Sequence, residues 1–237
     1  MKISIDSESA ITLVLGNDIS VGTHLRVMAL ADAIQKSAFP GLLEVVPAYA
    51  ALTVHFDPFC IRQCLPLSAG IPSAFVVRTL TEIERQTSHL LDLGDPAFLE
   101  KKWALETPVL EIPVHYGGEA GPDLPELADR LQLAASDIVR LHASSSYCVY
   151  MIGFLPGFPY LGPLPDALAV PRRATPRLKV PAGSVAIAGR QTGIYPQASP
   201  GGWHVIGHTD VCLFDPLAPS PSLLKPGMRV RFVPCDH

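Results

Sequence analysis

The chain has 237 residues, of which 48% are hydrophobic and 17% are charged. A net charge of −4, with lysines and arginines scattered along the chain, argues against nucleic acid or a membrane surface as a partner. The five cysteines are irregularly spaced, so we expect free thiols in a reducing, cytoplasmic setting and no metal site. No apolar run reaches the roughly 18 residues of a membrane span, and residues 1–9 do not resemble a signal peptide.

The first half of the chain alternates between strand and helix patterns. Apolar or alternating runs predict strands over 10–15, 43–46 and 52–56. Apolar residues at helical spacing predict one helix between the first two strands and another over 73–90. An alternating run over 109–116 completes the order β-α-β-β-α-β, which is the plan of ferredoxin-like domains.

The second half is rich in turn residues. The chain contains 24 prolines and 18 glycines, and many of them fall between Pro156 and Pro226. Two short helical patterns precede a series of short strand-like runs, which predicts a closed or nearly closed β-barrel. We therefore predict an α+β chain with two domains, 1–107 and 108–237, joined near Thr107 or just after the 109–116 strand. The helical patterns cover 124–133 and 137–142, and the strand-like runs cover 148–154, 184–188, 203–206, 211–214 and 229–233.

Several long segments occur in an order that matches a known family. The most specific are VYMIGFLPGFPYLG (149–162), VPRRATPRLKVPAGSVAIAGRQTGIYP (170–196) and SPGGWHVIGHTDVCLFDP (199–216). IPVHYGGEAGPDL (112–124), SLLKPGMRVRFVP (222–234) and the weaker VPAYAALTVHFDP (46–58) accompany them. Together they resemble the family called Kip inhibitor or allophanate hydrolase subunit 1. The resemblance implies a ferredoxin-like N-terminal domain followed by a cyclophilin-like β-barrel domain.

The resemblance also implies a function, because the best-supported activity in this family is that of the B subunit of bacterial 5-oxoprolinase. Such a subunit helps convert 5-oxo-L-proline to L-glutamate together with the A and C subunits. ATP with Mg²⁺ would act in the assembled complex, and we expect no cofactor bound tightly by this chain alone. Two alternatives stay open, namely inhibition of a sensor histidine kinase and carboxyl transfer as in urea carboxylase or allophanate hydrolase systems.

The turn Ser-Pro-Gly-Gly-Trp is the first candidate for a binding site. Pro200, Gly201 and Gly202 would present backbone N–H groups beside the flat side chain of Trp203. Such donors suit a carboxylate, a phosphate or a developing oxyanion. The simpler alternative is a tight turn with Trp203 filling the barrel.

Polar residues close to this turn extend the candidate site. The guanidinium of Arg190, the amide of Gln191 and the phenol of Tyr195 suit the carboxylate and lactam of 5-oxoproline. Lys179 could neutralise a phosphate, although an exposed lysine is more often simply solvated. We predict catalytic roles for Arg190, Tyr195 and His204, and substrate-binding roles for Gln191, Lys179, Pro200, Gly201, Gly202, Trp203 and His208.

Three further features of these segments have more than one interpretation. His208 stands where the family commonly has an arginine, so it would bind an anion only when protonated. The cluster of Arg172, Arg173 and Arg177 would face a nucleotide, a partner protein or solvent. The aromatic residues Phe154, Phe158 and Tyr160 would fill the core or line a pocket or an interface.

Overall fold

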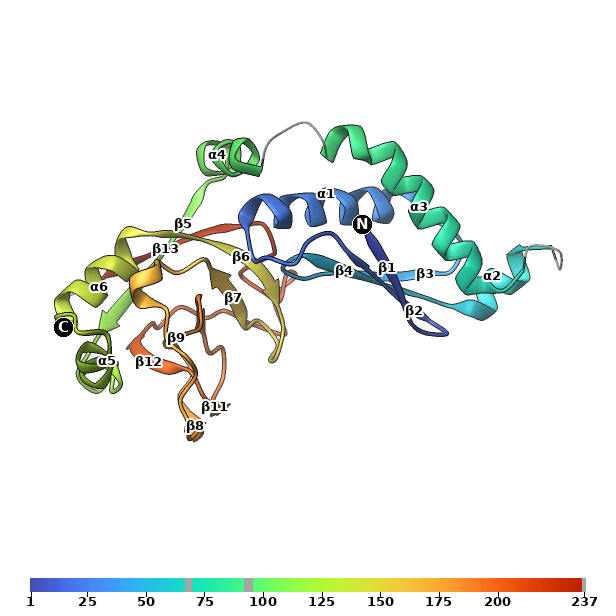
Figure 1. The fold of residues 1–237 in the computed structure, drawn as a ribbon. Helices are drawn as coiled ribbons and strands as arrows, with labels where there is room; N and C mark the ends of the chain where they lie inside the picture. The colour runs from blue at the N-terminus through green and yellow to red at the C-terminus, as the bar shows by residue number, and fades with distance from the viewer. Residues whose placement is uncertain (67–69, 92–95, 236–237) are drawn as a thin grey trace. The chain divides into compact units, whose positions relative to one another are not determined.

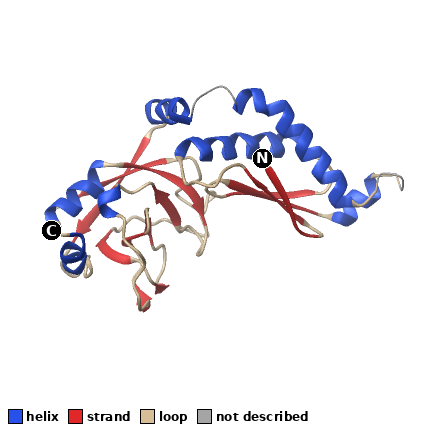
Figure 2. Ribbon diagram, viewed as in Figure 1, coloured by secondary structure: helices blue, strands red, loops and turns tan. Residues whose placement is uncertain are grey.

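The computed structural model describes residues 1–66, 70–91 and 96–235, which divide into two compact units, Met1–Leu105 and Glu106–His237 (Figure 1). The first unit carries long helices on a sheet, and the second consists mainly of short strands and loops (Figure 2). Among the described helices, none combines the length and the apolar character that a membrane span requires.

The N-terminal unit is built on a four-stranded antiparallel sheet with the order β1-β2-β4-β3. Its strands are β1 (Lys2–Ser7), β2 (Ala10–Val14), β3 (Leu42–Pro47) and β4 (Ala51–Phe56). Helices α1 (Val21–Ser37) and α3 (Pro72–Leu91) lie on one side of this sheet (Figure 1), and α2 (Pro58–Cys64) and α4 (Pro96–Glu106) flank α3 in sequence. Alternate residues of the two central strands are fully buried against the helices, as the pattern of 52–56 predicts.

The strand predicted over 109–116 does not complete this sheet, so the predicted order β-α-β-β-α-β is wrong. That segment forms β5 (Val109–Tyr116), which belongs to the barrel of the second unit. The place beside β2 is taken by β1, which pairs with β2 across a very short turn. A hairpin between neighbouring strands needs little loop-closure entropy, and this local pairing fills the edge position.

The second unit is a closed barrel with the strand order β10-β7-β6-β13-β5-β12-β9, and this finding confirms the predicted β-barrel. The pairs are antiparallel except for β13, which runs parallel to β5. Two short helices, α5 (Leu124–Leu131) and α6 (Ala135–Ser144), connect β5 to β6. The remaining barrel strands are β6 (Ser146–Ile152), β7 (Pro159–Gly162), β9 (Ser184–Ala188), β10 (Gln191–Ile194), β12 (His204–His208) and β13 (Arg229–Pro234).

Two segments beside the barrel depart from regular barrel strands. A two-stranded ribbon of β8 (Arg177–Val180) and β11 (Ser199–Gly201) stands next to it. The strand predicted over 211–214 is wrong, because this stretch forms only an isolated bridge between Phe214 and Ser222. The Thr209 hydroxyl accepts a hydrogen bond from the Val211 N–H at 3.3 Å, and this local bond competes with strand pairing.

A chain of hydrogen bonds around His142 fixes α6 to the inside of the barrel. The Nδ1 and Nε2 atoms of His142 lie 2.7 Å from the Tyr116 hydroxyl and 2.9 Å from the Thr192 hydroxyl. Thr192 donates its single proton to the Ala186 carbonyl at 3.1 Å. His142 therefore donates from Nε2 and accepts at Nδ1, as a neutral imidazole does. Its ring stacks on Phe232 at 4.5 Å, and burial lowers its pKa to about 3.

This buried imidazole predicts a specific dependence of stability on pH. Since the pKa of His142 is lower in the folded protein than in the unfolded chain, protons favour the unfolded chain. The stabilising contribution is complete above the ordinary pKa of 6.5 and is lost as the pH falls toward about 3. Within this window we expect the free energy of unfolding to fall by up to roughly 1.4 kcal/mol per pH unit more in wild type than in His142→Gln.

Urea unfolding of both proteins over a pH series measures this difference directly. Because all other titrating groups are shared, their contributions cancel in the comparison of the two proteins. Parallel pH profiles would show that the imidazole is not held in its neutral form by the fold.

Candidate functional site

A pocket of about 260 Å³ lies at the barrel, beside the β8–β11 ribbon. Its walls come from the β6–β7 loop, β7, the segment before β8, the end of β10 and the β11–β12 turn. Closure of the barrel brings these segments together from distant parts of the second unit. The lining residues are Phe154, Phe158, Tyr160, Arg172, Pro176, Tyr195, Pro200, Gly201, Gly202 and Trp203.

Aromatic rings form a continuous wall of this pocket. The buried ring of Phe158 lies at its centre and makes edge-to-face contacts with its neighbours. Its centroid is 5.0 Å from that of Tyr160, 5.2 Å from that of Tyr195 and 5.6 Å from those of Phe154 and Trp203. Such pairs add stability beyond that of the area they bury, so the wall is rigid before any ligand arrives.

The loop that carries Phe154 holds a costly backbone conformation. Phe154 has φ 67°, in the left-handed region that side chains other than glycine rarely adopt. Hydrogen bonds from the Gly153 N–H to the Phe158 carbonyl (3.1 Å) and from the Phe158 N–H to the Leu155 carbonyl (3.0 Å) close this loop. Strain of this kind persists where surrounding contacts enforce it, and it is frequent at functional sites.

Tyr195 places a hydrogen-bonding group in the otherwise aromatic wall. Its hydroxyl lies against Gly201 so closely that a Cβ atom there would overlap it, and glycine allows this approach. Burial raises the pKa of Tyr195, while a backbone hydrogen bond at Trp203 and the charge of Arg172 act in the opposite direction. The phenol is therefore protonated at neutral pH and can donate a hydrogen bond to a ligand.

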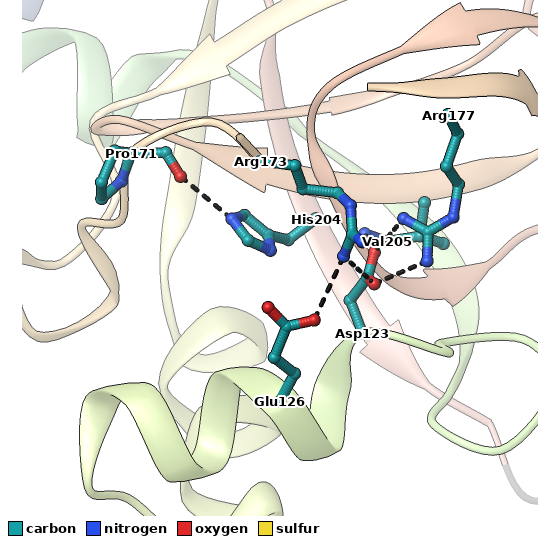
Figure 3. A network of polar contacts seen from close by, with 7 residues as sticks. All are labelled: Asp123, Glu126, Pro171, Arg173, Arg177, His204 and Val205. Carbon is teal, nitrogen blue, oxygen red and sulfur yellow. Dashed lines mark hydrogen bonds and ion pairs between the residues drawn. The ribbon is translucent and has the colours of Figure 1, made fainter. Parts of the chain in front are cut away.

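A buried carboxylate beside the pocket binds two arginines and a backbone N–H group (Figure 3). Asp123, which precedes α5 and is 2% exposed, accepts two hydrogen bonds of 2.6 Å from the guanidinium of Arg177. It also accepts hydrogen bonds from Arg173 Nη1 at 2.6 Å and from the Val205 N–H at 2.7 Å. Four donors thus satisfy one carboxylate and connect α5, β8 and β12.

The segment between Pro171 and Arg177 is held at several points. His204 Nε2 donates to the Pro171 carbonyl at 2.9 Å (Figure 3). The Arg173 N–H donates to the Gly202 carbonyl at 2.8 Å. Arg173 also lies 3.2 Å from Glu126 on α5. The other ring nitrogen of His204 is buried and has no hydrogen-bond partner among the residues described. The contacts of His204 in this structure therefore position the segment.

Five of the residues predicted for the site line the pocket together: Tyr195, Pro200, Gly201, Gly202 and Trp203. The other five, Arg190, Gln191, Lys179, His204 and His208, lie outside this lining. Arg190, in the turn between β9 and β10, forms an exposed ion pair with Asp166 at 2.7 Å. Gln191 begins β10, and Lys179 is exposed on β8. Their predicted roles remain predictions.

His208 lies at the end of β12, outside the pocket lining. Its Nε2 atom is 3.1 Å from the Ala182 carbonyl, which can only accept, so this nitrogen carries a proton. Its Nδ1 atom is 3.6 Å from a carboxylate oxygen of Asp210. Asp210 therefore lies beside the histidine that stands where the family commonly has an arginine.

The sequence reasoning missed Asp123 and left the roles of the arginines open. Asp123 stands before Leu124-Pro125, where an acidic residue is commonly interpreted as a helix cap. Its side chain makes no capping hydrogen bond and binds Arg173 and Arg177 instead. Arg172 separates from this pair and lines the pocket.

Replacing the buried carboxylate tests how much the network stabilises the second unit. Asp123→Asn removes the charge that two guanidinium groups share, so we expect a loss of about 3 kcal/mol in the free energy of unfolding. The matched control is Asp137→Asn, which breaks an exposed pair with Arg140 at 2.8 Å. That change should cost less than about 1 kcal/mol, because exposed ion pairs contribute little. Chemical denaturation measures both losses, and equal values would contradict a dominant role for Asp123.

Comparison with known proteins gives a consistent result over nearly the whole chain. The family described as "Carboxyltransferase domain, subdomain C and D" matches residues 1–224. The B subunit of 5-oxoprolinase from Haemophilus influenzae is 52% identical over 96% of this chain and 94% of that protein. The protein of the same name from Bacillus subtilis is 40% identical over 95% of this chain and 89% of that one.

A solved structure shares the architecture. The crystal structure of TTHA0988 superposes with a TM-score of 0.74 and 38% sequence identity over 96% of this chain. The chain spans only 40% of the length of TTHA0988. By sequence and by structure, the chain belongs to the family of carboxyltransferase domains, subdomain C and D.

Proposed function

We propose that this chain is the B subunit of an ATP-dependent 5-oxoprolinase and helps convert 5-oxo-L-proline to L-glutamate with the A and C subunits. The observation that carries the proposal is the set of relatives named as B subunits of 5-oxoprolinase, which are 40% to 52% identical over 95% to 96% of this chain. TTHA0988 contains further polypeptide beyond the part that this chain matches. This supports the proposal that the chain works together with other subunits.

The reaction requires activation of an unreactive amide. Transfer of the terminal phosphoryl group of ATP to the lactam carbonyl oxygen makes the ring carbon electrophilic. Water then adds to this carbon, the C–N bond breaks, and the nitrogen takes up a proton to become the amine. A second water releases phosphate from the resulting acyl phosphate and leaves the carboxylate of glutamate. Positively charged groups and N–H donors stabilise the oxygen charge that develops in these steps.

The pocket supplies a suitable place for the lactam. Its aromatic wall offers a flat apolar surface, and Tyr195 supplies a protonated phenol that can donate to the lactam oxygen. Arg190, Gln191, Lys179 and His208 lie outside the pocket lining, so we assign them to a shared site completed by the C subunit. His204 also lies outside the lining, but it is buried, and we assign it to positioning the segment before β8. The described residues hold no group of three side chains suited to bind a metal ion. We assign Mg²⁺ to the ATP phosphates in the assembled complex.

Two finer features belong to the same proposal. We infer that the closed barrel is of the cyclophilin-like type, and that the N-terminal sheet is a ferredoxin-like variant in which β1 replaces the final strand. A cytoplasmic location agrees with the five free cysteines.

The direct test is reconstitution of the complex. The chain is co-expressed with candidate A and C subunits, the complex is purified, and glutamate release is measured with ATP and 5-oxoproline. We expect release that requires all three chains and both substrates. A stable complex that lacks this activity would overturn the proposal.

A second experiment tests the pocket itself. Tyr195→Phe removes the phenolic donor and keeps the ring, so we expect turnover in the assembled complex to fall roughly tenfold or more. Tyr147→Phe is the matched control, since this buried tyrosine donates to the His142 carbonyl away from the pocket. Size-exclusion chromatography confirms assembly. Wild-type turnover in an assembled Tyr195→Phe complex would exclude the phenol from the reaction.

The family description favours carboxyl transfer as a second candidate function. A complex with this activity would move a carboxyl group between carboxybiotin and an acceptor and would release no glutamate. The same purified complex can be assayed for both reactions.

A further inference from the structure

We propose that Arg172 binds the carboxylate of the substrate, so that the pocket takes a small flat ring bearing one carboxylate. This inference rests on the proposed function, in which the pocket is part of a site for 5-oxoproline. It assigns the anion-binding role to an arginine that the sequence did not distinguish from its neighbours.

The charges around the pocket leave Arg172 available to bind an anion. Arg172 is the one charged side chain in the described pocket lining, which contains no carboxylate. Arg173 and Arg177 are already paired, because both form ion pairs with Asp123 at 2.6 Å and Arg173 also pairs with Glu126 at 3.2 Å. Arg190 is paired with Asp166 at 2.7 Å. Within the described parts of the chain, Arg172 has no carboxylate within ion-pair distance, so its charge is available to a ligand.

The backbone is held in place on both sides of Arg172. Its two neighbours are held by hydrogen bonds, from His204 to the Pro171 carbonyl (2.9 Å) and from the Arg173 N–H to the Gly202 carbonyl (2.8 Å). The guanidinium of Arg173 is bound to Asp123 as well. The backbone that presents Arg172 is therefore fixed before a ligand binds, which reduces the entropy lost on binding.

The surroundings of Arg172 identify the class of ligand. Arg172 lines the pocket together with Tyr160 and Tyr195, and its positive charge opposes the rise that burial causes in the pKa of both phenols. A carboxylate bound to Arg172 would leave the attached ring against the aromatic wall, with Tyr195 able to donate to a ring carbonyl. One guanidinium matches one carboxylate in charge and in planar geometry. A triphosphate carries more charge than this pocket neutralises, so we place ATP elsewhere in the complex.

A binding experiment on the full chain tests the inference without the partner proteins. The chain contains two tryptophans, so a Trp103→Phe background leaves Trp203 in the pocket wall as the fluorescent reporter. Two ligands are titrated: 5-oxoproline and pyrrolidin-2-one, which is the same lactam without the carboxylate. Far-UV circular dichroism establishes that each variant is folded.

We expect Arg172→Met to weaken binding of 5-oxoproline roughly tenfold to a hundredfold and to leave binding of pyrrolidin-2-one unchanged. Arg172→Lys should give an intermediate loss, since an ammonium keeps the charge without the bidentate geometry. Arg140→Met is the matched control, because this arginine is exposed on α6 and pairs only with Asp137 among the described residues. It should bind both ligands as the parent protein does.

Two results would overturn the inference: a parent protein with no saturable response to 5-oxoproline, or an Arg172→Met variant that binds it as tightly as the parent. In the assembled enzyme, Arg172→Met should raise the KM for 5-oxoproline and leave the KM for ATP unchanged. An unchanged KM for 5-oxoproline would also contradict the role of Arg172. An inactive wild-type complex would instead contradict the proposed function, while the titrations of the chain alone still decide the role of Arg172.

Discussion

The buried carboxylate of Asp123 is the constraint on which the candidate site depends. An ionised carboxylate removed from water is costly unless donors replace the lost hydration, and here two guanidinium groups and a backbone N–H do so. These donors come from the segment before β8, from β8 and from β12. One residue at the start of α5 therefore holds a loop and two strands in a single arrangement, and the β8–β11 ribbon depends on it for a fixed position.

The pocket results from this constraint acting together with barrel closure. Closure brings β7 and β10 side by side, and with them the rings of Tyr160 and Tyr195 around Phe158. The Asp123 network holds the segment that contributes Pro176 to the pocket lining. Neither element forms a pocket alone, since the aromatic wall needs a facing segment and that segment needs an anchor. The strained Phe154 completes a rigid wall whose conformation is determined without a ligand.

Sequence patterns predicted where strands form better than they predicted which strands and side chains contact one another. The alternation over 109–116 identifies a strand and its two faces, but alternation carries no information about which strand lies beside it. The predicted order β-α-β-β-α-β therefore counted β5 with the N-terminal sheet, although the predicted domains 1–107 and 108–237 place it with the barrel. The same limit applies to Asp123, because nothing near it in sequence indicates contact with Arg173, fifty residues away. By contrast, Trp203 and its glycine turn could be predicted as pocket residues, since aromatic and turn chemistry are local properties.

The cluster of arginines shows how one short segment can stabilise the fold and also present a positive charge to a ligand. Arg172 and Arg173 are adjacent, and neither lies in a helix. Neighbouring side chains of a non-helical chain tend to point to opposite sides, so one arginine turns toward Asp123 while the other turns toward the pocket. Pairing of Arg173 with Asp123 fixes the backbone on one side of Arg172, and the hydrogen bond from His204 to the Pro171 carbonyl fixes it on the other. The same pairing removes a competing cation from the site. The arginine that stabilises the fold thereby determines that its neighbour is the one available to bind an anion.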